Sequence, residues 1–246
     1  MRECAQVFGG GGMTITAILF DKDGTLLDFQ ASWGGWAVDV VQALSRGDHD
    51  RLTQLARVLG LDLAARTVLP GSVVIAGTAR DIGETIASVP GMGPADALTE
   101  RVVALSLEVT PVPLVPLAPV LQSLKARGLA LGVATNDAIA PTLLQLEVLG
   151  VADLFDFVAG YDSGYGAKPG PGPCLAFAKA MGRAPAECAM VGDSLHDLHA
   201  GGQAGMFRVA VTSGLASASE LGPQADLVVP DITHLNAWLE GRQDER

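Results

Sequence analysis

The stretch that decides the fold is ILFDKDGTLLDF, residues 18–29, in which an apolar segment runs directly into acidic residues. Asp21 and Asp23 stand one residue apart, and Gly24 and Thr25 follow. Two neighbouring carboxylates repel each other, so we expect such a pair where a cation or a reaction requires it. Gly24 allows a tight turn and the close approach of a ligand. A simpler alternative is a turn with solvated aspartates, because Asp-Gly turns are common.

Short apolar segments recur along the chain without strict alternation, as in parallel strands that are covered on both faces. Predicted helices separate them: Pro141 begins one that ends at Gly150, and Pro173 begins another. This order predicts an α/β fold with a doubly wound, mostly parallel sheet of the Rossmann-like type. The predicted strands are Thr16–Phe20, Leu129–Thr135, Leu154–Ala159, Cys188–Val191, Phe207–Val211 and Asp226–Val229.

The segment from residue 31 to 110 interrupts this order, because it shows helical patterns and no convincing strand. Asp48 can cap a helix that ends at Gly60, and another helix starts at Pro94. Thr67–Thr78 is predicted to be an apolar loop or a buried turn. We therefore predict a core of residues 13–30 and 111–246, a helical insertion of residues 31–110, and a disordered extension of residues 1–12.

Residues that suit an anion occur later in the chain. Ligands of an open parallel sheet bind beyond the carboxyl ends of its strands. Thr135 and Asn136 end the segment GVATND, where a hydroxyl and backbone amides can bind an anionic oxygen. Lys168 lies in SGYGAKPGPGP, where Pro169 stiffens a loop that can hold a compact positive charge against a phosphate. Alternatively, Thr135 and Asn136 only finish a strand, and Lys168 is simply solvated.

A second acidic segment, GDSLHD, follows the predicted strand Cys188–Val191. Asp193 and Asp197 are four residues apart at the start of a helix, which puts them on one side of it. They can merely complement the helix dipole. Together with Asp21 and Asp23 they can instead form an all-oxygen site for a hard cation, and Mg²⁺ prefers such ligands.

Composition excludes several classes of protein. Of 246 residues, 49% are hydrophobic, enough for a substantial core, and the net charge of -11 argues against a protein that binds nucleic acid. No apolar stretch reaches the roughly 18 residues that a membrane helix needs, so we expect no membrane partner. The three cysteines are odd in number and form no CxxC pair, which favours reduced thiols in a cytoplasmic protein.

Taken in order, DKDGTLL, Thr135, Lys168 and GDSLHD resemble the four motifs of the haloacid dehalogenase superfamily of hydrolases. The pattern is most similar to its phosphoglycolate-phosphatase-like branch, and the helical insertion matches the family's cap domain in position. The resemblance implies a phosphatase in which Asp21 attacks phosphorus and forms an aspartyl phosphate. Asp23 would protonate the leaving oxygen and then activate water, and dehalogenases of the superfamily lack an acid there.

The same resemblance implies Mg²⁺ as cofactor and a small phosphorylated metabolite as substrate. The implied metal ligands are Asp21, Asp23 through its backbone carbonyl, Asp193 and, directly or through its waters, Asp197. The implied contacts of the transferred phosphoryl group are Thr135, the amide of Asn136 and Lys168. A phosphosugar mutase or another phosphotransferase of this superfamily is an alternative.

More distant alternatives come from single motifs. GDSL at Gly192–Leu195 also spells the signature of a serine-esterase family, with Asp197 and His199 as imitations of its partner residues, although the spacing and the place in the chain are wrong for it. A phospho-aspartate receiver domain uses Asp, Thr and Lys around Mg²⁺, but it has neither a cap insertion nor a fourth acidic motif. Zinc is a poorer choice than a hard cation beside carboxylates.

Three residues of the insertion suggest contacts with a substrate. Trp33 and Trp36 can line a substrate pocket, but we favour the alternative that they only pack the insertion onto the core. Arg80, in GTARDIGET at a predicted helix start, is a hypothetical partner for an anionic or hydroxyl-rich remote group of the substrate. The competing interpretation is an exposed arginine paired with Asp81 or Glu84.

Overall fold

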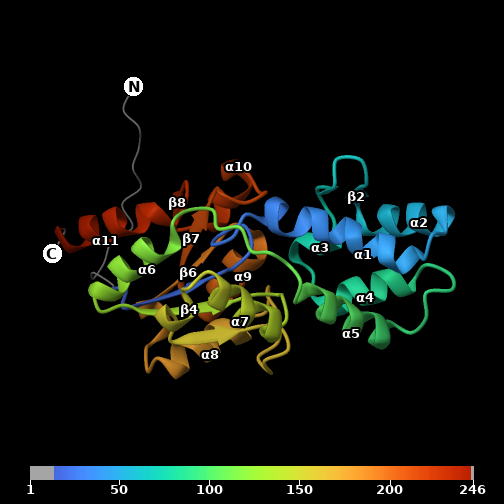
Figure 1. Cartoon of the computed structure of the whole chain (residues 1–246). Coiled ribbons are helices and arrows are strands. Elements are labelled where there is room, and N and C mark those ends of the chain that lie inside the picture. The colour runs from blue at the N-terminus through green and yellow to red at the C-terminus, as the bar shows by residue number, and fades with distance from the viewer. Residues whose placement is uncertain (1–13, 245–246) are drawn as a thin grey trace.

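Six parallel strands form the central sheet of the computed structural model, which describes residues 14–244 (Figure 1). Their order is β5-β4-β1-β6-β7-β8, and every pairing is parallel. This confirms the predicted fold class. The strands are β1 (Ala17–Phe20), β4 (Ala130–Ala134), β5 (Phe157–Ala159), β6 (Cys188–Gly192), β7 (Phe207–Val211) and β8 (Leu227–Val229).

The strand order reverses at β1, which pairs with β4 on one side and β6 on the other. Phe20, the last residue of β1, lies opposite Val133 and Val191. The three strands therefore end at nearly the same level, and the residues that follow them meet at one place. Such a reversal is where open α/β sheets bind their ligands.

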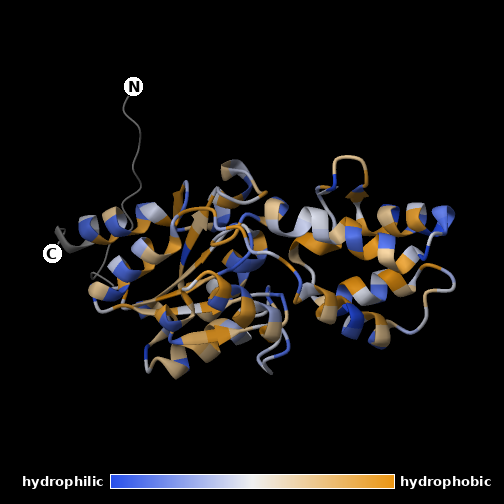
Figure 2. Cartoon of the chain, in the orientation of Figure 1, coloured by the Kyte–Doolittle hydropathy of each residue, from blue (hydrophilic) through white to orange (hydrophobic). Residues whose placement is uncertain are grey.

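Helices cover both faces of the sheet, which explains why its strands read as continuous apolar runs. Ile18 and Phe20 point into one hydrophobic cluster, whereas Ala17 and Leu19 point into another that includes Phe177 of α8. Figure 2 shows the hydrophobic residues concentrated on the strands and on the inner sides of these helices. The helices are α6 (Leu117–Ala126), α7 (Ile139–Val148), α8 (Gly172–Ala180), α9 (Leu195–Ala204), α10 (Ala218–Leu221) and α11 (Leu235–Asp244).

The insertion forms a helical lobe beside the sheet and has a hydrophobic cluster of its own (Figure 1). Asp48 caps α2 by accepting from the amide of Arg51, and Gly60 ends that helix with a φ of 66°, as predicted. The elements are η1 (Gln30–Gly34), α1 (Gly35–Ser45), α2 (His49–Leu59), β2 (Leu61–Asp62), β3 (Thr67–Val68), α3 (Val73–Ala76), α4 (Ala79–Ala87) and α5 (Ala95–Ser106).

Two expectations about local structure were wrong. The insertion contains a small antiparallel hairpin, β2 and β3, although no strand was predicted there. Each of its strands has two residues, too few to show an alternating pattern. The strand predicted at Leu154–Ala159 is shorter, because Ala152–Leu154 forms the 3₁₀ turn η2. Further 3₁₀ turns are η3 (Pro185–Glu187), η4 (Gly222–Gln224) and η5 (Ile232–His234).

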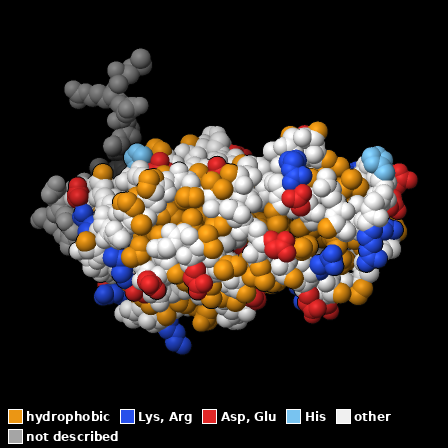
Figure 3. Space-filling model, viewed as in Figure 1, with side chains coloured by type: hydrophobic (Ala, Val, Ile, Leu, Met, Phe, Trp, Pro, Cys, Tyr) orange, Lys and Arg blue, Asp and Glu red, His pale blue; other side chains and the backbone are white. Residues whose placement is uncertain are grey.

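The predicted extension of residues 1–12 lies outside the described residues. The division of the chain into a core and a cap stays a prediction. Among residues 14–244, no helix combines the length and the apolarity that crossing a membrane requires. Cys174 and Cys188 are buried free thiols. On the face shown in Figure 3, basic side chains are scattered among acidic ones and form no continuous patch.

Candidate active site

Asp21 follows β1 directly, and its backbone amide continues the sheet by donating to the carbonyl oxygen of Val191 at 2.8 Å. Its side chain is 11% exposed. The carboxylate atom Oδ1 accepts from Lys168 Nζ at 2.6 Å and from the backbone amide of Lys22 at 2.6 Å. The residue that follows the strand thus delivers a fixed carboxylate to the edge of the sheet.

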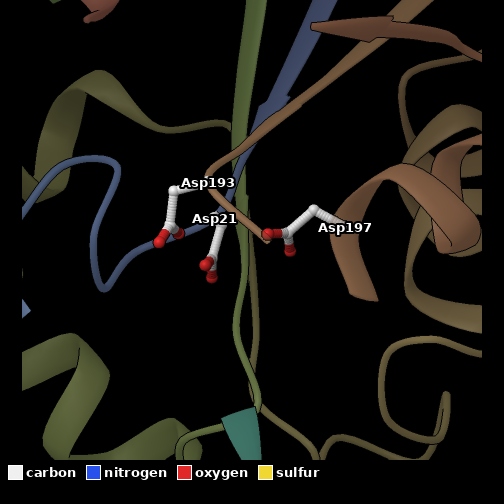
Figure 4. A group of neighbouring side chains, drawn as sticks. All are labelled: Asp21, Asp193 and Asp197. Atoms are coloured by element: carbon white, nitrogen blue, oxygen red, sulfur yellow. The ribbon is translucent and has the colours of Figure 1, made fainter. Parts of the chain in front are cut away.

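Asp21, Asp193 and Asp197 form one group of carboxylates, each offering an oxygen within 4.8 Å of the others (Figure 4). They come from the ends of β1 and β6 and from the first turn of α9. Two glycines make room for Asp193: a Cβ atom on Gly24 would lie 2.3 Å from its Oδ2, and one on Gly214 only 1.8 Å away. Gly24 also has a φ of 85°, which suits glycine. An all-oxygen group of this kind fits a hard cation such as Mg²⁺.

The pKa shifts of the site residues also indicate a place for a cation. Burial, and then the charge of Asp197, raise the pKa of Asp21 to about 7, although Lys168 opposes the shift. Burial also raises the pKa of Asp193 well above its ordinary value, and the charges of Asp21 and Asp197 add to the effect. Burial lowers the pKa of Lys168, but the charges of Asp197 and Asp21 outweigh it and raise that pKa overall. One lysine does not balance three carboxylates, so a cation would relieve the remaining repulsion.

Asp197 is held at both of its carboxylate oxygens. Oδ1 accepts from Lys168 Nζ at 2.7 Å, and Oδ2 accepts from the Ser194 hydroxyl at 2.6 Å and from its backbone amide at 3.0 Å. The contact with Ser194 is the capping box that begins α9. Ser194 is therefore engaged in capping, and His199 lines a different cavity, so the two do not form an esterase pair.

Asp23 is not part of the three-carboxylate group, and its own carboxylate is held by two donors. Trp33 Nε1 donates to its Oδ1 at 2.6 Å, and Lys22 Nζ lies 2.9 Å from its Oδ2. Lys22 is fully buried and also contacts Asp137 Oδ2 at 3.2 Å and Gln145 Oε1 at 2.5 Å. Sequence reasoning missed Lys22, Asp137 and Gln145, although a lysine set between two aspartates in a buried segment was a signal.

Thr135 and Asn136 follow β4 and lie beside Lys168 in the same cavity as Asp21. The Asn136 side chain accepts from the Lys168 amide at 2.9 Å and donates to the Lys168 carbonyl oxygen at 2.9 Å. It also donates to the carbonyl oxygen of Ala76 in α3 at 2.8 Å. Asn136 therefore ties the lysine loop to β4 and connects both to the helical insertion, a role that its position at a strand end did not reveal.

A single cavity collects the predicted site residues of the core, except the buried Asp197, together with a set of residues from the insertion. The core contributes Asp21, Asp23, Thr135, Asn136, Lys168 and Asp193. Trp33 and Trp36 also line this cavity, with their rings 4.9 Å apart in an edge-to-face arrangement. Both tryptophans belong to the hydrophobic cluster of the insertion as well. The two tryptophans therefore line the cavity in addition to packing in the insertion, whereas we had favoured packing alone.

Arg80 is not among the residues that line this cavity. Its side chain is 66% exposed, and its Nε lies 3.0 Å from Glu84 Oε1. The structure thus contains the exposed pair of the competing interpretation, and a contact between Arg80 and the substrate stays a prediction. The physical reason is the helical spacing, since residues four apart in α4 meet on its outer surface.

Comparison with known proteins agrees with this geometry. A family model described as haloacid dehalogenase-like hydrolase matches residues 15–205. Phosphoglycolate phosphatase of Escherichia coli (strain K12) is 38% identical over 117 residues, which cover 48% of this chain and 45% of that protein. The probable phosphatase IndB of Dickeya dadantii is 37% identical over 108 residues, 44% of this chain and 47% of that protein. The chain thus spans about half the length of the curated relatives it matches.

Solved structures show the same fold. A HAD phosphatase from Thermococcus onnurineus superposes with a TM-score of 0.64 at 26% identity, covering 92% of this chain and 99% of that one. A β-phosphoglucomutase from Clostridium difficile superposes with a TM-score of 0.61 at 22% identity, covering 94% of this chain and 98% of that one. Because these likenesses extend over nearly the whole chain, they include the insertion as well as the sheet.

Proposed function

The chain belongs to the haloacid dehalogenase-like hydrolases, and from this premise we propose that it hydrolyses a small phosphate monoester through a phosphoryl group carried on Asp21. One observation carries the proposal. Asp21, fixed at the end of the central strand, shares a cavity with an acidic side chain, Asp23, that is separately held. A nucleophile and an acid–base group side by side are what a two-step ester hydrolysis needs.

In the first step, the Asp21 carboxylate attacks phosphorus and the bond from phosphorus to the ester oxygen breaks. The leaving oxygen takes the proton of Asp23, so that a neutral alcohol departs and Asp21 carries the phosphoryl group. In the second step, the Asp23 carboxylate takes a proton from water, whose oxygen attacks phosphorus. The bond between phosphorus and Asp21 breaks, phosphate is released and both side chains return to their initial states.

We further propose that Asp21, Asp193 and the backbone carbonyl of Asp23 hold Mg²⁺. Asp197 joins them or orients the waters of the ion, and the three hydrogen bonds that its carboxylate already accepts favour the orienting role. When bound, Mg²⁺ supplies positive charge against the charge that develops on the transferred phosphoryl oxygens. The three-carboxylate group supports this assignment, because its oxygens lie close together and one lysine leaves their repulsion unbalanced.

Thr135, the amide of Asn136 and Lys168 would receive the oxygens of the phosphoryl group. Their position in the cavity beside Asp21 supports this role. Lys168 is fixed by two carboxylates, so its charge is placed before the substrate arrives, as preorganised electrostatic catalysis requires. The hydrogen bonds of Asn136 to the backbone of Lys168 keep the two loops together.

Residues 31–110 are proposed to act as a cap on a core of residues 13–30 and 111–246. The insertion supplies one side of the cavity and has its own hydrophobic cluster. A cap of this kind keeps water and other acceptors away from the phosphorylated Asp21 until the alcohol has left. The names of the curated relatives suggest 2-phosphoglycolate as one substrate to test.

The test is phosphate release from a panel of phosphate monoesters, with Mg²⁺ and with excess chelator. The wild type should be active only with Mg²⁺, and Asp21→Asn should be inactive but folded, because an amide is not a nucleophile. Ser194→Ala is the control and should stay active, although less so than the wild type, because it loses only the hydroxyl bond to Asp197 and keeps the amide bond. The reverse pattern, with activity kept in Asp21→Asn and lost in Ser194→Ala, would indicate an esterase. Bisphosphate formed without phosphate release would indicate a mutase.

A further inference from the structure

The half of the cavity that the insertion provides is apolar. Its main side chains are Trp33, Trp36, Ile75, Ile82 and Val102, and Phe29, which directly precedes the insertion, adds to them; we call these six residues the apolar wall. Ile75 comes from the short helix α3, which lies where the two lobes of the molecule join (Figure 1). Ser106, which also lines the cavity, has its hydroxyl bound to the carbonyl oxygen of Val103 at 2.7 Å. A ligand that reaches this side therefore meets mostly carbon.

Positive charge is scarce in the same cavity. Among the described residues that line it, Lys168 is the only lysine or arginine, and its Nζ lies 2.6 Å from Asp21 and 2.7 Å from Asp197. Four lining residues are aspartates: Asp21, Asp23, Asp137 and Asp193. Arg80, the cation that the sequence offered for a remote anionic group, faces solvent. A second negative charge on the substrate would therefore have no counter-charge against the apolar wall.

We infer that the favoured substrate, given the phosphatase activity proposed above, carries a neutral and largely apolar alcohol, such as an aryl or benzyl group, on its phosphate. Aromatic and aliphatic side chains gain free energy by covering such a group. Burying a carboxylate against them without a partner costs free energy. On this ground 2-phosphoglycolate, whose remote group is a carboxylate, is a poor substrate of this chain, although relatives matching half of it carry that name.

His196 is the one side chain in the cavity that complicates this assignment. It lines the cavity from the core side, and its Nδ1 is buried without a hydrogen-bond partner. A neutral ring nitrogen can bond a hydroxyl or carbonyl group of an otherwise apolar alcohol. A protonated ring could instead pair with a carboxylate. The experiment therefore includes His196→Gln, which keeps a polar side chain and removes the possible charge.

Two esters that differ in one charge provide the test: benzyl phosphate and 4-carboxybenzyl phosphate, compared by kcat/KM with Mg²⁺. The wild type should prefer benzyl phosphate by about 10- to 100-fold, the range that hydrophobic pockets achieve, and should hydrolyse 2-phosphoglycolate poorly. Ile75→Lys puts a cation into the wall and should reduce the preference. Leu69→Lys, which adds the same charge at a position that is 42% exposed and outside the cavity lining, should leave it unchanged.

A wild-type preference for 4-carboxybenzyl phosphate or 2-phosphoglycolate over benzyl phosphate would overturn the inference. If that preference then disappears in His196→Gln, His196 is the partner of the substrate's carboxylate. Ratios of two substrates on one enzyme are insensitive to partial unfolding of a variant. If no ester is hydrolysed at all, the proposed function fails. The inference is then decided by calorimetric binding of benzylphosphonate and 4-carboxybenzylphosphonate. Tighter binding of benzylphosphonate supports it, and equal or weaker binding of benzylphosphonate contradicts it.

Discussion

The indole Nε1 of Trp33 donates a 2.6 Å hydrogen bond to Oδ1 of Asp23. The bond joins the first turn of the insertion to the loop that follows β1. Lys22 fixes the other oxygen of the same carboxylate at 2.9 Å, and its Nζ lies 5.0 Å from the centre of the Trp33 ring. Both oxygens of the proposed acid–base group are thus positioned, one by the core and one by the proposed cap. The position of the cap and the orientation of Asp23 are therefore coupled.

The first prediction concerns this bond. Trp33→Phe keeps an aromatic ring but removes the donor, and we expect kcat to fall about tenfold, as for one hydrogen bond of roughly 1.5 kcal/mol to a charged group. The loss should shrink for an ester with a good leaving group, which needs little protonation. The matched control is Trp36→Phe. Trp36 lines the same cavity, but its Nε1 donates to the Leu105 carbonyl oxygen at 2.9 Å. Equal losses in both variants would exclude a specific role for Trp33.

The second prediction concerns the buried cation Lys22. Burial lowers its pKa, but the charges of Asp23 and Asp137 outweigh burial and raise the pKa above its ordinary value. Lys22→Met leaves two partly buried carboxylates, 14% and 11% exposed, without their fully buried cation and should lower the free energy of unfolding by about 3 kcal/mol or more, measured in urea. Lys125→Met, which breaks a 2.7 Å pair with Asp156 at the surface, should cost less than about 1 kcal/mol.

A further variant separates packing from charge at Lys22. Asp137→Asn in the Lys22→Met background removes one of the two stranded carboxylates, so part of the lost stability should return. If the double variant is no more stable than Lys22→Met alone, repulsion between carboxylates is not the cause of the loss, and Lys22 acts mainly by filling space.

Asp21, Asp193 and Lys168 could be predicted as one site because each follows a recognisable signal. Two come directly after apolar strands, and the parallel order of the strands brings their ends together. The network around Lys22 could not be predicted in this way. Its partners Asp137 and Gln145 are 115 and 123 residues away in the chain, and no periodic pattern indicates which distant loop or helix the lysine contacts.

The insertion shows the same limit of local signals. Its helices were predictable because Asp48 and Gly60 mark the two ends of α2 with conventional caps. Arg80 lacks such a local signal for its partner. A cation near a helix start suggested an anion site, but the direction of its side chain depends on how α4 packs, which the sequence does not show. The cavity-lining role of Trp36 likewise depends on how the two lobes meet.

The third prediction concerns the space around Asp193. A Cβ atom on Gly214 would lie 1.8 Å from Oδ2 of Asp193, so Gly214→Ala must displace that carboxylate. We expect the Mg²⁺ concentration for half-maximal activity to rise about 10- to 100-fold, the range for a disturbed metal ligand sphere. Gly222→Ala is the control, because a Cβ atom there meets nothing within 4 Å. An unchanged Mg²⁺ requirement in Gly214→Ala would remove Asp193 from the proposed metal site.

The last prediction separates the two aspartates of the opening motif. Asp23→Asn should lower kcat by about 100-fold or more, because both proton transfers depend on this side chain. An ester with a good leaving group needs little protonation in the first step, so phosphorylation of Asp21 should still be detectable. Attack of water still needs the missing base, and the phosphorylated protein should therefore accumulate.

Rapid-quench measurement with a labelled aryl phosphate distinguishes the two steps, and Asp21→Asn, which should show no labelling, is the control. If Asp23→Asn slows labelling and its decay equally, the division of roles between Asp21 and Asp23 is wrong, even if both residues prove essential.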